Sequence, residues 1–434
     1  MKRHLGVADA AALFVGIILG SGIFVAPATV AGAVASPGAA ALLWLTGGVV
    51  CLAGATTYAE CARRLPFSGG FFVFYREAFG PALAFVGGWT ALAITYPASI
   101  AAIALVFAAY AGPLFGLAPS PWLAAGAVVL AALVNVAGLR TGPAVQKSLT
   151  AAKVAALAAL CAAAWLRAPA PPPPAADLPL DAAAVFGAML LVLWTYDGWS
   201  DVTLVAGEVR DPGRGLARAI VLGVAVLAAV YVLVQVATLR LLPAGLAAAS
   251  SRPVAEAVEA GLGPRAGSFV GALVALSTFG AIQAAVFTTS RLGYAMAHGE
   301  AFPAWFGGLH PRFGTPARAT SVVASAIVLY VFAAPFRDLV GYFTFAVWIF
   351  YGTTAFALLR LRRRGTGGTA PEGPAVAAPY VVFAVGAVVT ASLTAQDPKR
   401  AAIGLAMLSA GFPLYALWRL AVSRPSAPPP APPR

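Results

Sequence analysis

The chain has 434 residues, of which 61% are hydrophobic and 10% are charged, and its formal net charge is +13. So large an apolar share excludes a soluble globular protein and indicates an integral membrane protein. The positive charge is spread over short loops instead of forming a basic face with interleaved aromatic residues, so we expect no nucleic-acid binding.

Twelve predominantly apolar segments follow one another along the chain, each near the ~20 residues that cross a bilayer as a helix. They cover about 9–34, 38–62, 80–112, 121–138, 142–166, 182–208, 216–242, 264–298, 317–334, 337–361, 376–395 and 399–421. We predict an all-α integral membrane protein with twelve transmembrane helices in a single domain over residues 1–421. We expect the N-terminal MKRHLGVADA, which has no small-residue cleavage site, to stay in the mature protein, and the Pro-rich segment 422–434 to be a disordered tail.

The basic residues predict the orientation of these spans. If the spans alternate in direction, most of the 28 Lys and Arg residues fall in segments on one side of the membrane. Positive residues concentrate on the cytoplasmic side, so both termini and the Pro-rich tail are predicted to be cytoplasmic. The bias toward Ala, Gly and Arg is typical of a high-GC bacterial genome, so the expected location is the bacterial cytoplasmic (inner) membrane.

The first span contains the sequence GIILGSGIFVAP at residues 16–27, in which three small residues interrupt an apolar run. In the bilayer core an unpaired backbone N–H or C=O costs several kcal/mol unless it meets a ligand or a cavity. Unwinding at Gly20, Ser21 and Gly22 would expose amides on one half-helix and carbonyls on the other. An α-amino acid, with its carboxylate and amine on one carbon, complements both. The alternative is a small-residue face that packs against another helix.

The sixth span favours the first of these interpretations. Its sequence FGAMLLVLWTYDGWSDVTLVAGE carries a helix breaker, Gly198, beside an acidic residue, Asp197. A carboxylate within the membrane is costly and indicates a functional site. Breaks in spans one and six are expected of a five-plus-five inverted repeat with its binding site at the midplane. The repeats would cover about 9–166 and 182–361, with two peripheral helices at about 376–421.

Four motifs, in order along the chain, are similar to those of a known family. GSGIFVAP resembles its helix 1 signature, and RRLPFSGGFFVFYREAFGP (63–81) its re-entrant loop. WTYDGW with GEVRDPGRGLARAI (207–220) resembles the junction of helices 6 and 7, and SRLGYAMAHGEAFPAWFGGLHPRFGTPARA (290–319) the end of helix 8 and the following loop. The family is the amino acid–polyamine–organocation superfamily, most closely its L-type amino-acid transporter branch. The resemblance covers the whole chain and implies a LeuT-like fold with broken helices 1 and 6.

The resemblance also implies how an amino acid is bound. Its carboxylate would be held by backbone amides of the broken helix 1, and its amine by backbone carbonyls. The amides are those of Ser21, Gly22 and Ile23, and the carbonyls those of Ile18, Trp194 and Asp197. Gly198 would complete the break in helix 6.

Several side chains near these breaks have two interpretations each. Asp197 either caps the broken helix or binds a cationic substrate side chain, and the apolar surroundings favour a neutral substrate. Trp194 and Trp199 either pack in the core or close over the ligand. In the second case Trp199 would act as a gate. Tyr96, where Pro97 is expected to kink helix 3, either lines the site or packs.

Glu208 lies near the inner end of helix 6 among arginines, where we expect a structural or gating ion pair. Lys153 places an ammonium inside the fifth span and either reaches the cytoplasmic interface or lies within the bundle. The resemblance implies that it stands where sodium sits in sodium-coupled relatives, which would make sodium unnecessary. Ser277 and Thr278 are candidate partners in helix 8, although hydroxyls bonded to their own helix are the alternative.

The predicted function is secondary active transport of L-amino acids by alternating access, with exchange of one amino acid for another as the preferred mode. The alternatives are proton-coupled uptake and transport of cationic amino acids through Asp197. An intramembrane enzyme is disfavoured because the histidines, His4, His298 and His310, lie in the terminus and loops. A channel is disfavoured because no charged ring or filter repeat appears. We expect no cofactor, no metal, and no disulfide-linked heavy subunit, since the loop GPLFGLAPSP between helices 3 and 4 has no cysteine.

Overall fold

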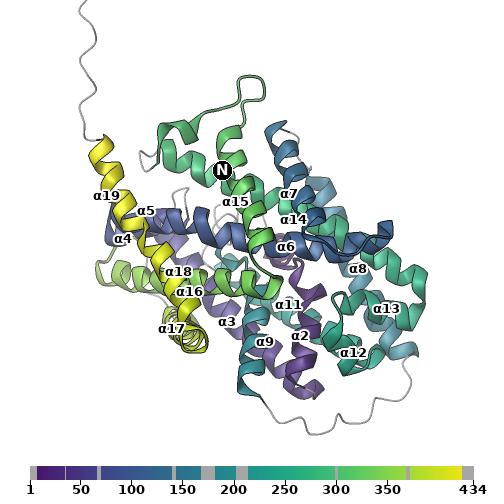
Figure 1. Cartoon of the computed structure of the whole chain (residues 1–434). Coiled ribbons are helices and arrows are strands. Elements are labelled where there is room, and N and C mark those ends of the chain that lie inside the picture. Colours follow the sequence, from purple (N-terminus) through teal and green to yellow (C-terminus); the bar gives the residue numbers. More distant parts are fainter. Residues whose placement is uncertain are drawn as a thin grey trace, which may run out of the picture.

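The computed structural model describes residues 7–34, 36–65, 70–138, 143–167, 181–201, 214–298, 302–367 and 372–422. Over these ranges the chain is all-helical (Figure 1). Seven helices there are long and apolar enough to cross a membrane by length and composition, and four shorter apolar helices accompany them. The predicted fold class is therefore confirmed at the level of an all-helical, multi-pass architecture.

The helices of the first half of the chain follow the predicted spans closely. They are α1 (Val7–Ile18), η1 (Gly22–Phe24), α2 (Ala26–Ala33), α3 (Pro37–Arg64), α4 (Phe71–Phe79), α5 (Pro81–Thr90), η2 (Ala91–Thr95), α6 (Tyr96–Ala111), η3 (Gly112–Phe115), α7 (Pro121–Val136), α8 (Pro143–Arg167), α9 (Ala182–Thr195) and η4 (Trp199–Asp201). Several of them begin with proline, whose fixed φ suits the first turn of a helix.

The helices of the second half are longer and less interrupted. They are α11 (Arg214–Leu241), α12 (Ala244–Ala249), α13 (Pro253–Leu262), α14 (Pro264–His298), η5 (Ala304–Gly307), α15 (Ala317–Ala333), α16 (Phe336–Arg363), η6 (Gly373–Ala375), α17 (Ala378–Gln396), α18 (Pro398–Ser409) and α19 (Gly411–Val422). The last predicted span, 399–421, is thus two helices that meet at Ala410.

The kink expected at Pro97 takes the form of a π-helical stretch, η2, between α5 and α6. Proline has no N–H, so in a regular α-helix the carbonyl four residues earlier, that of Ala93, would lack its donor. The hydroxyl of Tyr330 on α15 donates to this carbonyl at 3.1 Å. A side chain from a neighbouring helix therefore compensates the break and ties α15 to this segment.

The helices after α16 lie at the edge of the molecule, as predicted. In Figure 1 the yellow helices α18 and α19 run along one side, where they contact α5 and α17. Only 11% of an 18-residue apolar stretch in Pro398–Leu420 is buried, against 72% in Phe336–Arg363. Burial is therefore concentrated in the helices that precede α17.

Glycines on α3 let the central helices approach one another. A Cβ on Gly47 would lie 2.6 Å from Cγ1 of Val192, and one on Gly54 would lie 2.2 Å from the ring of Trp199. The two glycines are seven residues apart, so they lie on one face of α3. Small residues of this kind allow close packing of membrane helices, and here they place α9 and η4 directly against α3.

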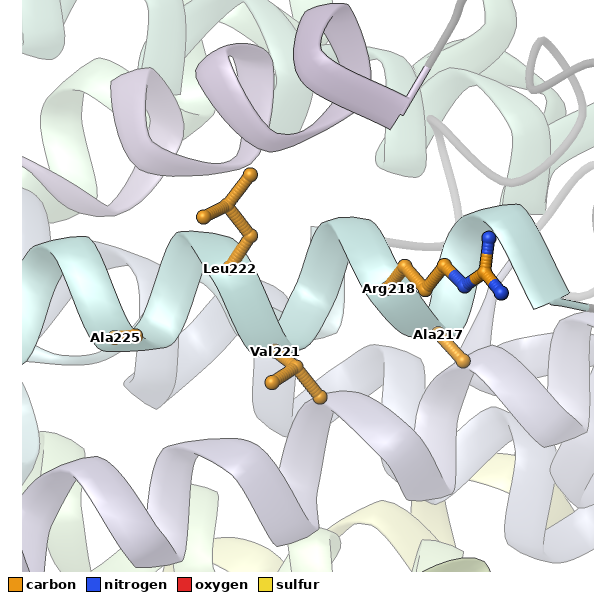
Figure 2. Close-up of a pocket in the computed structure, with 5 residues that line it drawn as sticks. All are labelled: Ala217, Arg218, Val221, Leu222 and Ala225. Atoms are coloured by element: carbon orange, nitrogen blue, oxygen red, sulfur yellow. The ribbon is translucent and has the colours of Figure 1, made fainter.

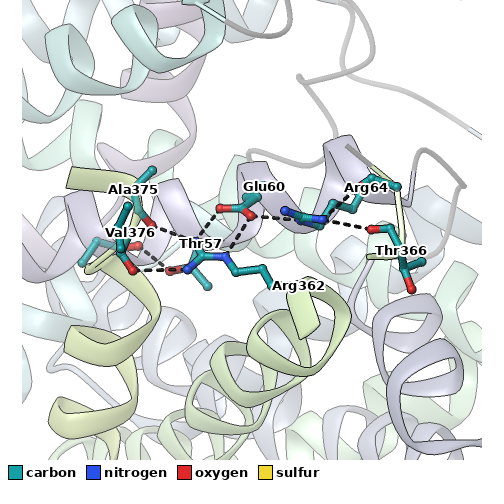
Figure 3. A network of polar contacts seen from close by, with 9 residues as sticks. Thr57, Glu60, Arg64, Arg362, Thr366, Ala375 and Val376 are labelled. Atoms are coloured by element: carbon teal, nitrogen blue, oxygen red, sulfur yellow. Dashed lines mark hydrogen bonds and ion pairs between the residues drawn. The ribbon is translucent and has the colours of Figure 1, made fainter. Parts of the chain in front are cut away.

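A buried ion network joins the ends of α3 and α16 (Figure 3). The carboxylate of Glu60 accepts hydrogen bonds from Arg64 at 2.9 Å and from Arg362 at 2.6 and 3.0 Å. Arg64 also donates to the carbonyls of Thr366 and Gly367, at 3.0 and 2.8 Å. The three charged side chains are thus held by one another and by the chain that follows α16.

Candidate functional site

The first span is broken at the predicted position. Helix α1 ends at Ile18, and after Leu19, Gly20 and Ser21 a single 3-10 turn, η1, leads into α2. Residues from Ile18 to Phe24 are buried apart from Gly20, which is half-buried. The backbone is therefore non-α-helical within the core, where each polar group needs a partner.

The sixth span is broken as well. Helix α9 ends at Thr195, and Asp197 and Gly198 follow in irregular backbone before η4. Gly198 has φ of 111°, a conformation that residues with a side chain rarely adopt, which explains the glycine at this place. The N–H of Asp197 donates to the carbonyl of Trp194 at 3.1 Å, which tightens the end of the helix.

The two breaks lie against each other. A Cβ on Gly22 would lie 2.6 Å from Oγ1 of Thr195 and 2.9 Å from its Cα, so only glycine fits between the two backbones. The hydroxyl of Tyr231, on α11, lies 3.3 Å from the carbonyl oxygen of Ile18 and 3.3 Å from that of Thr195. One side chain therefore bridges the ends of both half-helices, where their dipoles are negative.

Side chains also satisfy the carbonyls that follow the first break. Because Ala28 donates to Val25 at 3.1 Å, the carbonyl of Phe24 has no α-helical donor, and the hydroxyl of Tyr110 donates to it at 2.6 Å. Gln235 donates to the carbonyl of Pro27 at 3.4 Å and accepts from the indole of Trp44 at 3.1 Å. The C-terminal side of the break is thus rigidly held.

The amides at the first break differ from these carbonyls. Ser21, Gly22 and Ile23 are buried, and their backbone N–H groups donate to no acceptor among the residues that the structure describes. Buried N–H groups without partners are rare in proteins. Three successive amides at the start of a helical segment have the chemistry to hold an anion such as a carboxylate. The carboxylate-binding role that the sequence predicted for these three amides stays a prediction.

The side chains around the second break are held by neighbouring helices. The indole of Trp194 donates to Oγ of Ser99 on α6 at 3.4 Å and packs edge-on against Phe336. The hydroxyl of Tyr351, on α16, donates to the carboxylate of Asp197. Asp197 thus connects the broken helix to α16.

Trp199 is buried in an aromatic cluster just after the break. Its ring centroid lies 4.0 Å from that of Tyr351, 5.5 Å from that of Tyr58 and 6.3 Å from that of Trp348. These residues come from η4, α3 and α16. The cluster thus packs η4 against α3 and α16, and a gating role for Trp199 stays a prediction.

For the other predicted site residues the structure gives burial or helix position but no contact with the two breaks, or does not describe them. Tyr96 is half-buried and lies one turn before Ser99 on the same face of α6. Ser277 is half-buried on α14, and the neighbouring hydroxyl of Thr278 donates to its own helix at Val274 and Ala275. Lys153 lies in α8, which packs against α11 and α14, but its side chain is outside the described part of the chain. Glu208 also lies outside the described residues.

Tyr231 and Gln235 are central to the site, and the sequence interpretation missed them. Both are fully buried, they are the polar residues within the apolar stretch 219–237 of α11, and they are four residues apart, so they face the same way. Polar groups on one face of a transmembrane helix indicate contacts with other helices. This spacing was visible in the sequence, but three of the four hydrogen-bond partners of these two side chains are backbone carbonyls, which no sequence pattern identifies.

A groove of about 440 Å³ lies on the outer face of α11 (Figure 2). It is lined by Ala217, Arg218, Val221, Leu222 and Ala225. Figure 2 shows Val221 and Leu222 pointing to opposite sides of the helix. All five residues lie on α11 and precede Tyr231 by six positions or more, and none of them belongs to the two broken segments.

An all-helical membrane protein with two facing helix breaks at its centre belongs to the class of transporters that bind substrate at discontinuous helices. Comparison with known proteins specifies the family. The model of the family described as amino acid permease matches residues 5–415. The chain belongs to this family, which confirms the resemblance to the amino acid–polyamine–organocation superfamily that the four motifs indicated.

Individual relatives cover most of the chain. It is 31% identical over 377 residues to the b(0,+)-type amino acid transporter 1 of Homo sapiens. This alignment covers 83% of this chain and 76% of the relative. It is 30% identical over 435 residues to the large neutral amino acids transporter small subunit 2 of Mus musculus, covering 96% and 81%. It is 28% identical over 425 residues to the serine/threonine exchanger SteT of Bacillus subtilis (strain 168), covering 96% of each chain.

Proposed function

We propose that this protein is a secondary transporter that carries L-amino acids across the membrane by exchanging one for another. The observation that carries the proposal is a set of three buried amides, Ser21 to Ile23, which have no acceptor in the described part of the chain and lie beside the carbonyl ends of two broken helices. Amides attract a carboxylate and carbonyls attract an ammonium group, so the pair complements the part that all α-amino acids share. The relatives named as amino-acid transporters and as an exchanger support the same function.

The amine is proposed to contact the carbonyls of Ile18, Trp194 and Asp197. The carbonyl of Ile18 lies next to the hydroxyl of Tyr231, which keeps it oriented at the end of α1. The carboxylate of Asp197 already accepts a hydrogen bond from Tyr351, which supports its structural role and a neutral substrate. Recognition of a cationic side chain by Asp197 is the alternative.

The proposed mechanism is alternating access around this site. The first ten of the twelve spans would form a five-plus-five inverted repeat, in which α1, α2, α3, α9 and α11 move against the helices of spans three to five and eight to ten. Both chain termini are proposed to be cytoplasmic, as the distribution of basic residues suggests. The broken helices and their aromatic neighbours Trp194 and Trp199 would open and close the site on its two sides.

Lys153 is proposed to replace the sodium ion of sodium-coupled relatives, with Ser277 as a candidate neighbour. Helix α8 packs against α14, which is the eighth predicted span, and this supports a position of Lys153 near α14. The fixed ammonium of Lys153 would stabilise the loaded site in place of a sodium ion. Exchange would then need no sodium gradient.

The protein is proposed to work without a disulfide-linked partner, although one relative is named a small subunit. Of its three cysteines, Cys51 and Cys61 are buried and Cys161 is half-buried in α8. The segment 112–121, where L-type carriers with a heavy subunit have the linking cysteine, has none.

The first experiment measures uptake of radiolabelled neutral and cationic amino acids into proteoliposomes in sodium-free buffer. We expect uptake that saturates and that increases several-fold when unlabelled amino acid is enclosed, with neutral amino acids as the better substrates. Uptake that needs only an inward proton gradient, and is the same in liposomes without internal amino acid, would support proton symport instead. Flux that increases linearly with concentration would indicate a channel.

The second experiment removes the hydroxyl that bridges the breaks. We expect Tyr231→Phe to lower the exchange rate about tenfold, because two carbonyl ends lose a hydrogen bond and are less well positioned. Tyr380→Phe, which alters an exposed tyrosine on α17, is the matched control and should exchange normally. Equal rates for the two variants would contradict a positioning role for Tyr231.

A further inference from the structure

A groove of about 250 Å³ lies at the C-terminal end of α16, away from the helix breaks. It is lined by Phe356, Leu359, Arg360 and Arg363. Phe79 of α4 stacks on Phe356 with ring centroids 5.8 Å apart, and the guanidinium carbon of Arg360 lies 5.7 Å from the ring of Phe79. The groove is therefore formed where α4 meets α16, and aromatic rings shape it.

One end of this groove is positively charged. Arg360 and Arg363 are exposed and three residues apart, so they lie on one face of α16. Neither forms an ion pair within the described part of the chain, whereas Arg362 between them is bound to Glu60. On α4, the negative charge of Glu77 is balanced by the positive charge of the adjacent Arg76.

The other end of the groove is apolar. Phe356 is 49% exposed although it lies in a helix long and apolar enough to cross a membrane, so this face of α16 is suited to contact lipid acyl chains. Leu359 extends the apolar lining toward the arginines. An apolar floor that ends in two guanidinium groups complements a phospholipid, in which an apolar acyl chain is joined to a negatively charged phosphate.

We propose that this groove binds an anionic phospholipid, with the phosphate on Arg360 and Arg363 and an acyl chain against Phe356 and Leu359. Guanidinium groups pair with phosphate through two parallel hydrogen bonds, so the pair of arginines selects a negatively charged headgroup. In the proposed orientation the lipid belongs to the cytoplasmic leaflet, which is the side that carries most of the chain's positive charge. The site holds together α4 and α16, which are far apart in the sequence.

The test is native mass spectrometry of the full-length protein in detergent with added phosphatidylglycerol or phosphatidylcholine of the same chain length. We expect the wild type to retain phosphatidylglycerol and R360Q/R363Q to bind it about 30-fold more weakly. R363Q alone, which removes no described packing contact, is expected to weaken binding about fivefold and covers the case in which the double variant does not fold. F356A/L359A should also weaken retention, because the acyl chain loses its contacts.

The matched control is R312Q/K399Q, which removes the same charge from exposed positions outside the groove and should bind as the wild type does. Equal retention of phosphatidylcholine, or unchanged binding by R363Q and R360Q/R363Q, would overturn the proposal. Displacement of the lipid by millimolar inorganic phosphate would also overturn it, because the arginines would then bind a free anion. Binding is measured without transport, so the result is independent of the proposed function.

Discussion

Gly22→Ala is expected to abolish amino-acid exchange. The added Cβ would lie 2.6 Å from Oγ1 of Thr195 and 2.9 Å from its Cα, and backbone atoms cannot move aside as a flexible side chain can. The two half-helices would have to separate, at a cost of about 1–3 kcal/mol or more. Separation displaces the amides of Ser21 to Ile23 from the carbonyl ends that they face, so substrate binding is lost with transport.

The neighbouring glycine provides the control for this prediction. A Cβ on Gly20 would have only the carbonyl oxygen of Ile18 nearby, at 3.6 Å, which is an ordinary contact. We expect Gly20→Ala to fold and to exchange amino acids at a rate near that of the wild type. The measurements are exchange in proteoliposomes and a melting curve of each purified variant. Normal exchange by Gly22→Ala would show that the close approach of the two breaks is not needed.

Removal of the buried carboxylate at the end of α3 is expected to have the largest effect on stability. Glu60→Gln would leave Arg64 and Arg362 without their counter-charge, and the side chains of these two arginines are only 5% and 13% exposed. Breaking a buried ion pair by removing one partner costs about 3–5 kcal/mol, since the remaining charge is not compensated. We expect a lower melting temperature in detergent and lower yield of folded protein.

Two further variants separate this effect from a general loss of charge. Asp338→Asn removes a carboxylate that pairs with the half-exposed Arg400 at 2.8 Å, and it should cost less than about 1 kcal/mol. The double variant E60Q/R362Q should be more stable than E60Q, because one of the two unpaired charges is removed as well. A melting temperature of E60Q equal to that of D338N would contradict a stabilising role for the network.

The sequence was most informative where backbone chemistry leaves few options. Glycines in the middle of apolar spans predicted both helix breaks, because a bilayer tolerates an unpaired amide only with a compensating partner. Both breaks are where the sequence placed them, and substrate binding by the amides of Ser21, Gly22 and Ile23 stays a prediction. Pro97 likewise predicted an irregular third span, although the π-helical form of η2 and the compensating hydroxyl of Tyr330 depend on α15.

Side-chain roles were harder to predict because they depend on which helices meet. Trp199 packs against Tyr351 and Tyr58, from two helices that are distant in the sequence. Asp197 accepts a hydrogen bond from α16, and neither of its two sequence interpretations named that partner. Tyr231 acts on carbonyl groups, which every residue has, so no residue type marks its partners.

By itself, then, the sequence determined that this chain lies in a membrane, where its helices break, and to which family it belongs. The length of each apolar segment and the glycines within it decide these features locally, within one span. Only the tertiary structure decided that the breaks face each other across Gly22 and Thr195, and that Tyr231 joins them. The physical reason is that unpaired backbone groups in lipid must be satisfied, but the packing of the helices selects the group that satisfies them.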